Sequence, residues 1–352
     1  MYLQRSLWLG CFIGAAVAGL TVSASTAQGT PASIKGLEEA WSVKGSWTGV
    51  ASNGDKGTIY VIDPYGKCAE VDLTGKIQRE FEVPEGSASI LRLARLPGKA
   101  GKALLTFSRW GDELRAYDLN GKQLWKYPGR DGIDDVWAGD LNGDGADEVI
   151  VGYNGDTGLH VLDGSGKLLW KSTAIANVWH VCAGDVLGEG KAQVVTTSAR
   201  GKVHVFGADG KKIKDLDAGF YASMVRIGTA PGKDGAAMVF VAGSVLGGGE
   251  AGELQRIQIL AAALSGTGMK KWSLSLPTDV VSADVAQGRP WLAVGMSSGQ
   301  VHVVDTDKGE IIAGLTDEGR NPEVGWATIK GTEAPVLLVA SGERSSALRV
   351  TK

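Results

Sequence analysis

Hard oxygen ligands alternate along residues 140–148. Asp140, Asn142 and Asp144 occupy the first, third and fifth positions, and the Ala146 carbonyl and the Glu148 side chain occupy the seventh and ninth. Calcium prefers this mixture of carboxylate, amide and carbonyl oxygens, because its coordination by oxygen is flexible. The spacing predicts one structural calcium site. The alternative is a turn rich in Asp and Asn that binds no ion.

A second loop, residues 185–193, has the same length but different ligands. Leu187 replaces the third-position amide and Gln193 replaces the ninth-position carboxylate. We therefore expect this loop to bind no metal. A helix–loop–helix calcium hand is excluded at residues 140–151, because its twelfth position is Val151 and strand-like sequence flanks the loop.

Residues for nucleophilic or acid–base catalysis are few, since the chain has 4 histidines and 3 cysteines. Residues 295–299 match Gly-x-Ser-x-Gly, but a nucleophile elbow needs a strand followed by a helix, and strand-like runs lie on both sides here. The glycine-rich residues 247–252 lack the acidic residue about twenty positions on that dinucleotide binding needs. We find no nucleophile, base and orienting group that could act together.

Turn glycines recur at intervals of 39 to 58 residues. Short runs rich in β-branched residues precede nearly all of them, as at residues 148–152, 159–163 and 301–305, and such runs predict strands. A strand-based period in the low forties is typical of propeller blades rather than helical repeats. The seven turn glycines are Gly36, Gly75, Gly121, Gly166, Gly210, Gly268 and Gly309.

The two ends of the chain complement each other. Residues 37–43 look like an outer strand with no partners, whereas residues 325–329, 335–340 and 347–351 look like three strands that lack a fourth. Closing a ring with the N-terminal strand protects the sheet edges. We therefore predict an all-β chain that forms a seven-bladed β-propeller of four-stranded antiparallel blades, with six or eight blades as alternatives.

Two segments resemble known propeller families. Residues 140–152 (DLNGDGADEVIVG) resemble the calcium loop and following strand of FG-GAP (VCBS-type) repeats. Residues 262–272 (AALSGTGMKKW) resemble the tryptophan-docking motif of PQQ-like propellers, with Leu264 in place of its Asp. The resemblance implies that Trp125, Trp170 and Trp272 wedge between neighbouring blades as structural residues.

Three histidines occupy the same position in separate repeats. His160, His204 and His302 each lie in the third strand of a predicted blade. Equivalent positions lie apart around a ring, so these side chains cannot share one metal. We expect each of them to pack or to form hydrogen bonds between blades.

The loops of one propeller face should converge on the mouth of the central channel. There the sequence offers aromatic rings for stacking, together with Asp, Asn and His for directional hydrogen bonds, which suits sugars or extended peptides. Some of these aromatic residues could instead belong to the core. The expected face residues are Trp110, Asp134, Asp135, Tyr153, Asn154, Asp156, Trp179, His180, Tyr221, Trp326 and Arg344.

The N-terminus resembles an export signal. Arg5 precedes an apolar run at residues 7–22, and small residues allow cleavage after Ala24 or Ala27. A lipoprotein anchor at Cys11 is the weaker alternative, because Trp8 stands where a small aliphatic residue is needed. We expect a signal peptide at residues 1–27 and one propeller domain at 28–352, with its longest loop insertion at 243–252. The protein would be periplasmic or secreted, and no membrane span is expected.

Composition limits the partners. The 36 Lys and Arg residues and the 39 Asp and Glu residues are interspersed and give a net charge of −3, which argues against nucleic acid. We expect an exported, monomeric, non-catalytic module that binds a protein or a glycan. The alternative is a polysaccharide lyase or hydrolase that uses Asp134, Asp135 and His180. A quinoprotein dehydrogenase is disfavoured, so no PQQ is expected.

Overall fold

The structure is a computed structural model that describes residues 36–53, 57–83, 89–97, 101–229, 237–248, 254–316, 319–327, 334–342 and 344–351. The chain divides into two units, Met1–Ala32 and Ser33–Lys352. The signal peptide expected at residues 1–27 lies outside the described residues, as do residues 249–252 of the expected loop insertion. The fold described below belongs to the second unit.

Every element of the described residues is a β-strand, which confirms the all-β prediction. Four sheets contain four strands that follow one another in sequence and pair antiparallel. They are β2 (Gly49–Asn53), β3 (Thr58–Ile62), β4 (Lys67–Val71) and β5 (Ile77–Glu82); β13 (Val178–Gly184), β14 (Gln193–Ser198), β15 (Val203–Phe206) and β16 (Lys212–Leu216); β17 (Tyr221–Thr229), β18 (Ala237–Gly248), β19 (Leu254–Leu264) and β20 (Lys270–Leu276); and β21 (Val280–Val285), β22 (Trp291–Met296), β23 (Gln300–Asp305) and β24 (Glu310–Thr316).

A fifth sheet has seven strands because one long strand serves two four-stranded units. The first part of β9 (Gln123–Gly139) pairs with β8, and its last part pairs with β10. The chain stays extended between these two parts of β9. The other strands are β6 (Ile90–Arg95), β7 (Lys102–Phe107), β8 (Gly111–Asp118), β10 (Glu148–Tyr153), β11 (Leu159–Leu162) and β12 (Leu168–Ser172).

The sixth sheet joins the two ends of the described chain. It contains β25 (Glu323–Ala327), β26 (Val336–Ala340) and β27 (Arg344–Val350), with β1 (Leu37–Lys44) at its outer edge. The register pairs Leu37 with Val350 and Lys44 with Arg344. A strand from the N-terminal side therefore supplies the outermost strand of the C-terminal sheet.

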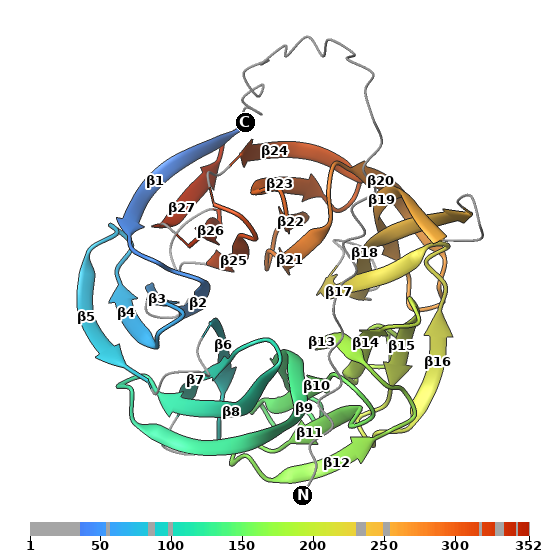
Figure 1. Ribbon diagram of the computed structural model, residues 1–352, viewed down its shortest axis with the longest axis horizontal. Coiled ribbons are helices and arrows are strands. Elements are labelled where there is room, and N and C mark those ends of the chain that lie inside the picture. The colour runs from blue at the N-terminus through green and yellow to red at the C-terminus, as the bar shows by residue number, and fades with distance from the viewer. Residues whose placement is uncertain are drawn as a thin grey trace, which may run out of the picture. The chain divides into compact units, whose positions relative to one another are not determined.

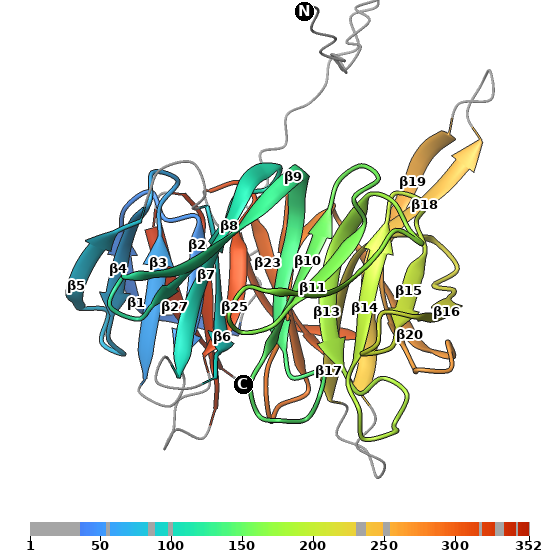
Figure 2. The same ribbon diagram turned by 90° about the horizontal axis from the view of Figure 1, so that it is seen from below.

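The sheets surround a central axis, with β2, β6, β9, β13, β17, β21 and β25 innermost (Figure 1). Seen from the side, the inner strands run along this axis (Figure 2). Apolar side chains between neighbouring sheets form the core, and every residue of β10 and of β14 is buried. In the described chain, no helix has the length and apolar character needed to cross a bilayer.

Outer-strand side chains connect neighbouring four-stranded units at the turn glycines. A Cβ added to Gly166 would lie 2.6 Å from the Trp125 ring, so only glycine leaves room for the indole. Trp125 also donates its indole N–H to the Gly164 carbonyl at 3.0 Å. Trp170 and Trp272 repeat the arrangement against Gly210 and Gly309, with N–H donation to the carbonyls of residues 208 and 306 at 2.7 Å.

Candidate functional site

Four of the expected face residues line one pocket of about 550 Å³, which we name the mouth pocket. They are Trp110, Asp134, Trp179 and His180. The part of β9 that pairs with β10, the starts of β13, β17 and β21, and the turn before β8 carry the lining. Three further lining residues, Arg109, Ser223 and Val280, were not predicted.

Trp110 forms the exposed wall of the mouth pocket. Its side chain is 73% exposed, and its φ of 60° lies in the left-handed region that few non-glycine residues adopt. Its backbone N–H donates to the Ile133 carbonyl at 2.6 Å, which holds the turn against β9. Such strain is concentrated at functional sites, and an exposed indole held in this way offers a flat ring to a ligand.

Trp179 provides the second aromatic wall. Its ring packs against Tyr221 with centroids 5.9 Å apart. The Tyr221 hydroxyl donates to the Ala199 carbonyl at 2.5 Å, so Tyr221 supports Trp179. Tyr221 was expected on the face itself, and its structural position is beside the pocket rather than in its lining.

Asp134 gives the pocket a carboxyl group that titrates near neutral pH. Burial raises the pKa of Asp134 to about 6, although a hydrogen bond from Trp110 and the Arg109 charge oppose the shift. Within the described residues, its buried Oδ2 has no hydrogen-bond partner. The group can therefore act as either a donor or an acceptor toward a ligand, depending on pH.

Asp135 has a different role from its neighbour, because it is at the centre of a buried ionic cluster. Its Oδ2 accepts from His180 Nδ1 at 3.1 Å and lies 3.3 Å from Arg226 Nη1, while its Oδ1 lies 3.6 Å from Arg92 Nη2. Burial alone would raise its pKa, but Arg226, His180 and Arg92 together hold the pKa of Asp135 well below its usual range. Asp135 is therefore a fixed anion.

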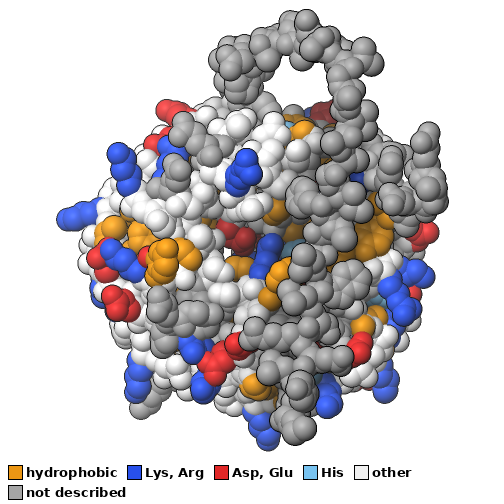
Figure 3. Space-filling view, viewed as in Figure 1, with side chains coloured by type: hydrophobic (Ala, Val, Ile, Leu, Met, Phe, Trp, Pro, Cys, Tyr) orange, Lys and Arg blue, Asp and Glu red, His pale blue; other side chains and the backbone are white. Residues whose placement is uncertain are grey.

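Arg92 and Arg226 complete what we name the axial plug, which consists of Arg92, Asp135, Trp137, His180 and Arg226. The two guanidinium groups lie 5.9 and 5.0 Å from the centre of the Trp137 ring. Arg226 also donates from Nε to the Ala283 carbonyl at 2.8 Å. Burial lowers the pKa of His180 despite the Asp135 charge, which favours a neutral imidazole. Acidic and basic side chains are visible together at the centre of the ring (Figure 3).

Arg109 crosses the mouth of the channel. It lies in the turn before β8, and its Nη2 donates to the Val281 carbonyl in β21 at 2.9 Å. The same arginine lines the mouth pocket and a second hollow of about 240 Å³ that contains Ser89, Asn321 and Glu323. The hydrogen bond from Arg109 to Val281 therefore lies between two compartments of the mouth.

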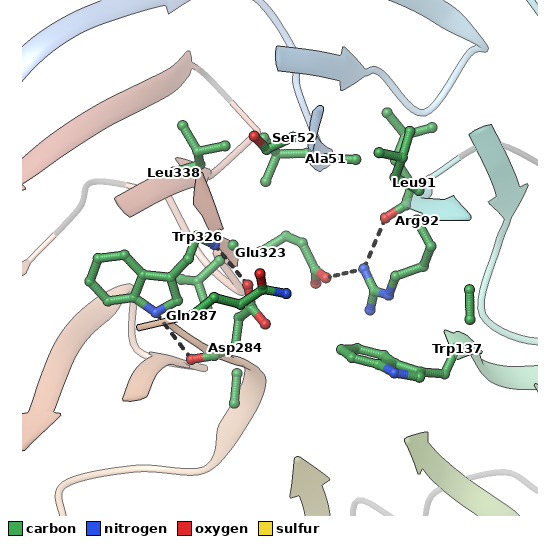
Figure 4. Close-up of a pocket in the computed structure, with 16 residues that line it drawn as sticks. Ala51, Ser52, Leu91, Arg92, Trp137, Asp284, Gln287, Glu323, Trp326 and Leu338 are labelled. Carbon is green, nitrogen blue, oxygen red and sulfur yellow. Dashed lines mark hydrogen bonds and ion pairs between the residues drawn. The ribbon is translucent and has the colours of Figure 1, made fainter. Parts of the chain in front are cut away.

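A further pocket of about 240 Å³, which we name the axial pocket, is lined mainly by the inner strands β2, β6, β9, β21 and β25. Arg92, Glu323 and Gln287 point toward its middle, above the Trp137 ring (Figure 4). Arg92 Nη1 donates to Glu323 Oε1 at 2.8 Å. An arginine in the middle of an otherwise apolar strand, such as Arg92 in β6, is the sequence signal that could have indicated the axial plug and the axial pocket.

Two expected face residues belong to the core instead. Tyr153 has no exposed surface, donates its hydroxyl to the Pro128 carbonyl at 2.9 Å and packs on His160 at 4.8 Å. Trp326 is 8% exposed and donates its backbone N–H to Asp284 Oδ2 at 2.7 Å. Large aromatic rings bury more area between sheets than at a loop surface, which explains both positions.

The remaining face residues lie away from the mouth pocket lining. Asn154 accepts from the Gly155 N–H at 2.8 Å and so shapes its own turn. Arg344 pairs with Glu39 at 3.2 Å, where β27 meets β1. Asp156 is exposed beside the same turn as Asn154.

The loop expected to bind calcium is held by its own polar side chains. Asp140 accepts from the backbone N–H groups of Gly143 and Gly145 at 2.6 and 2.9 Å. Asn142 turns its amide nitrogen toward Asp144 Oδ2 at 3.1 Å and Glu148 Oε1 at 2.8 Å. An amide group therefore lies between two carboxylates.

The ligand types of this loop suit calcium, but their positions do not converge. Burial, with help from the charges of Asp144 and Asp140, raises the pKa of Glu148, so excess negative charge gathers there. Among the residues that the structure describes, no three His, Cys, Asp or Glu side chains are placed to hold a metal ion. Binding would require Asn142 to turn its amide nitrogen away and the carboxylates to move inward.

The three equivalent histidines have three different environments. His160 Nδ1 lies 3.0 Å from the Tyr127 hydroxyl of the preceding blade. His204 lies 2.9 Å from Ser198 Oγ and 2.6 Å from Asp215 Oδ1, an arrangement like that of a hydrolase triad. Ser198 is only 1% exposed, so a substrate cannot reach its hydroxyl. Within the described residues, neither ring nitrogen of His302 has a partner.

Comparisons with known proteins identify the fold. A family model described as the lambda-carrageenase beta-propeller domain matches residues 108–241, less than half of the chain. A crystal structure of BBS1N in complex with ARL6DN, soaked with mercury, superposes with a TM-score of 0.64 at 14% identity and covers 90% of this chain and 97% of that one. The search of curated proteins finds no match. The chain is a β-propeller.

Proposed function

We propose that this protein is a non-catalytic propeller module that binds a glycan in the mouth pocket. One observation carries the proposal: two indole rings, from Trp110 and Trp179, line the same 550 Å³ pocket as Asp134, His180 and Ser223. Aromatic walls with a few convergent polar groups are the usual composition of a small-ligand site. A sugar ring can stack on an indole while its hydroxyls meet the polar groups.

The carrageenase match favours a glycan over a peptide. Six of the seven lining residues, all except Val280, come from the matched segment 108–241. The part of the chain that is similar to a carrageenase propeller is therefore the part that builds this pocket. A protein partner, which a propeller face also suits, is the competing outcome of the test.

The test is a glycan array followed by calorimetric titration of the strongest ligand. We expect Trp110→Ala to weaken binding by at least tenfold, because it removes a stacking surface but leaves the fold intact at a 73% exposed position. Tyr65→Ala is the matched control, since Tyr65 is 68% exposed and does not line the pocket. Equal loss in both variants, or no glycan bound by the wild type, would contradict the proposal. A protein captured from the cell envelope through Trp110 would favour a protein partner.

A second candidate function is polysaccharide cleavage in the same pocket. Asp134, with its pKa raised to about 6, could donate a proton to a leaving oxygen, and His180 is oriented by Asp135 as a neutral base. Such an activity would fall as the pH rises through about 6, because Asp134 loses its proton. A reducing-end assay on the bound glycan decides between the two. Turnover that Asp134→Asn abolishes would favour the enzyme.

We also propose that the ring has seven blades and that β1 closes it. The pairing of β1 with β27 and the shared strand β9 support this count. Membership of the PQQ-like or FG-GAP type is part of the same proposal. It is supported by the tryptophans that dock at turn glycines and by the polar loop at residues 140–148.

Export, calcium binding and a monomeric state complete the proposal. We propose a signal peptide at residues 1–27, a mature domain at 28–352 and a periplasmic or secreted location, on the basis of the N-terminal sequence pattern. One structural calcium at residues 140–148, with no PQQ, is supported by the oxygen-rich ligand types described above. Mass spectrometry of the mature protein would locate the cleavage site and report bound calcium and mass.

A further inference from the structure

We propose that the axial pocket is a second binding site, which takes an organic cation, an aliphatic ammonium or guanidinium group, beside Asp284 and Glu323. This site is distinct from the mouth pocket, since the two share no lining residue. The proposal goes beyond glycan binding and does not depend on it.

The first argument is charge balance on the axis. Asp135 is compensated by Arg226 at 3.3 Å, and Glu323 by Arg92 at 2.8 Å. Asp284 is the third carboxylate near these groups. Within the described residues, no cation lies at ion-pair distance from it, and its contacts are the backbone N–H groups of Trp326 at 2.7 Å and Val285 at 2.9 Å. The axis therefore carries one carboxylate more than its arginines balance.

The second argument is the cost of that carboxylate. Burial raises the pKa of Asp284, which two backbone hydrogen bonds and the more distant arginines only partly oppose. An unpaired charge in a partly buried pocket is unfavourable, and a cation supplied by a ligand relieves it. Asp284 and Glu323 face the same cavity from β21 and β25 (Figure 4).

The third argument is the shape and lining of the pocket. Its volume of about 240 Å³ is below the range of about 300–1,000 Å³ for drug-sized ligands, so a small group fits best. Leu91, Leu338 and Val50 provide apolar surface for an alkyl stem, and the lining also includes the exposed, polar Gln287. An alkyl chain with a charged head matches this combination of surfaces.

An anionic ligand fits less well. Among the described residues that line the pocket, Arg92 alone carries a guanidinium. Arg92 already donates to Glu323 and to the Leu91 carbonyl at 3.0 Å, and it lies 3.6 Å from Asp135. An added anion would face Asp284 and Glu323 across a small space. The charges that face the pocket therefore select for a cation.

The experiment titrates the folded protein with n-butylammonium, n-butylguanidinium and the neutral isostere n-butanol, followed by calorimetry and by the indole N–H resonances of the tryptophans. We expect both cations to bind at least tenfold more tightly than n-butanol. The resonance of Trp326 should shift, because its indole N–H donates to the Asp284 carbonyl at 3.2 Å. Equal binding of n-butanol, or shifts confined to Trp110 and Trp179, would overturn the proposal.

Two variants sharpen the result. Asp284→Asn should lose at least tenfold in cation affinity, whereas Asp209→Asn, which makes the same charge change at an exposed turn, should bind as the wild type does. Unchanged affinity in Asp284→Asn would sink the proposal. If that variant unfolds, the comparison of cation with n-butanol on the wild type still decides. If N-acetyl-lysine N-methylamide binds more tightly than n-butylammonium, the natural occupant is a side chain of a partner protein. The reverse order would indicate a free amine.

Discussion

Two neighbouring blades, β9–β12 and β13–β16, have the same backbone arrangement but carry different side chains at equivalent positions. In the inner strands, Asp134 and Asp135 of the first blade occupy the positions that Trp179 and His180 occupy in the second. All four residues meet in or below the mouth pocket. The difference teaches that the sheet sets where side chains point, while a few inner positions set the chemistry of the pocket lining.

The turns of the same two blades make the point again. Asp140 and Asp185 each accept hydrogen bonds from two backbone N–H groups, so the same kind of contact holds both turns. Glu148 accepts from the Leu141 N–H at 2.8 Å, and Gln193 accepts from the equivalent Val186 N–H at 2.9 Å. A neutral amide thus holds the second turn without any need for a cation. The carboxylates of the first turn exceed what its backbone requires.

Substitutions at the equivalent inner positions 135 and 180 should show the largest difference between the two blades in their effect on the free energy of unfolding. We expect Asp135→Asn to lower the free energy of unfolding by about 3–5 kcal/mol, because it leaves Arg226 buried without its anion. His180→Gln, at the equivalent position, should cost only about 1 kcal/mol, the value of one hydrogen bond. Urea unfolding measures both. A cost below about 1 kcal/mol for Asp135→Asn would remove the basis for the plug as an ionic cluster.

Calcium should distinguish the two turns by the next largest effect. At a calcium concentration 100 times the Kd, binding would stabilise the fold by about 2.7 kcal/mol, visible as a rise in Tm over a chelator-treated sample. Glu148→Gln makes the first turn resemble the second and should abolish the rise. Asp185→Asn, in the second turn, should leave it intact. A Tm that changes with neither chelator nor added calcium would show that the two turns are alike in binding no calcium.

Removing the first aspartate of each turn should show what they share. Asp140→Ala and Asp185→Ala each delete an acceptor of two backbone hydrogen bonds at a half-buried position, so each should cost about 1–2 kcal/mol in metal-free protein. Chemical unfolding in the presence of chelator provides the measurement. A much larger cost at Asp140 alone would mean that the first turn depends on something the second lacks.

The smallest effect concerns pH. In the metal-free protein the pKa of Glu148 is raised by burial and by Asp144 and Asp140, so the folded state holds this proton more tightly than the unfolded state. Ionising Glu148 therefore costs stability, and the loss develops as the pH rises from the unfolded pKa through the folded one. Glu148→Gln should be more stable than the wild type at pH 7 by less than about 1 kcal/mol, with no difference near pH 4. A gain that persists at pH 4 would point to packing rather than charge.

The strands and turns could be predicted because their signals are local. Alternation of apolar residues, β-branched runs and recurrent glycines report on a few neighbouring residues each. The packing of Trp125 and Trp170 between blades was implied by the resemblance to the tryptophan-docking motif of PQQ-like propellers. The continuity of β9 has no such local signal, because residues 129–132 contain two glycines and two charged residues, a composition typical of turns.

The candidate site was predicted only in part, because its contacts join distant segments. Trp110, Asp134, Trp179 and His180 were placed near the mouth by their position in the repeat. Which side chain pairs with Asp135 could not be read from the sequence, since Arg92 and Arg226 come from other blades and depend on the order of sheets around the axis. The burial of Tyr153 and Trp326 follows from packing between sheets, which repeat position alone does not report.

The pairing of β1 with β27 has a mechanical consequence. Leu37, at the beginning of one strand, lies beside Val350, at the end of the other, so the first and last described residues, Gly36 and Thr351, lie at the same end of an antiparallel ribbon. A tensile load applied between the termini would separate this ribbon one residue pair at a time, in the manner of a zipper, instead of loading all its hydrogen bonds at once. Tethering by both ends would therefore unravel the molecule at low force, whereas attachment through a single end would leave it intact.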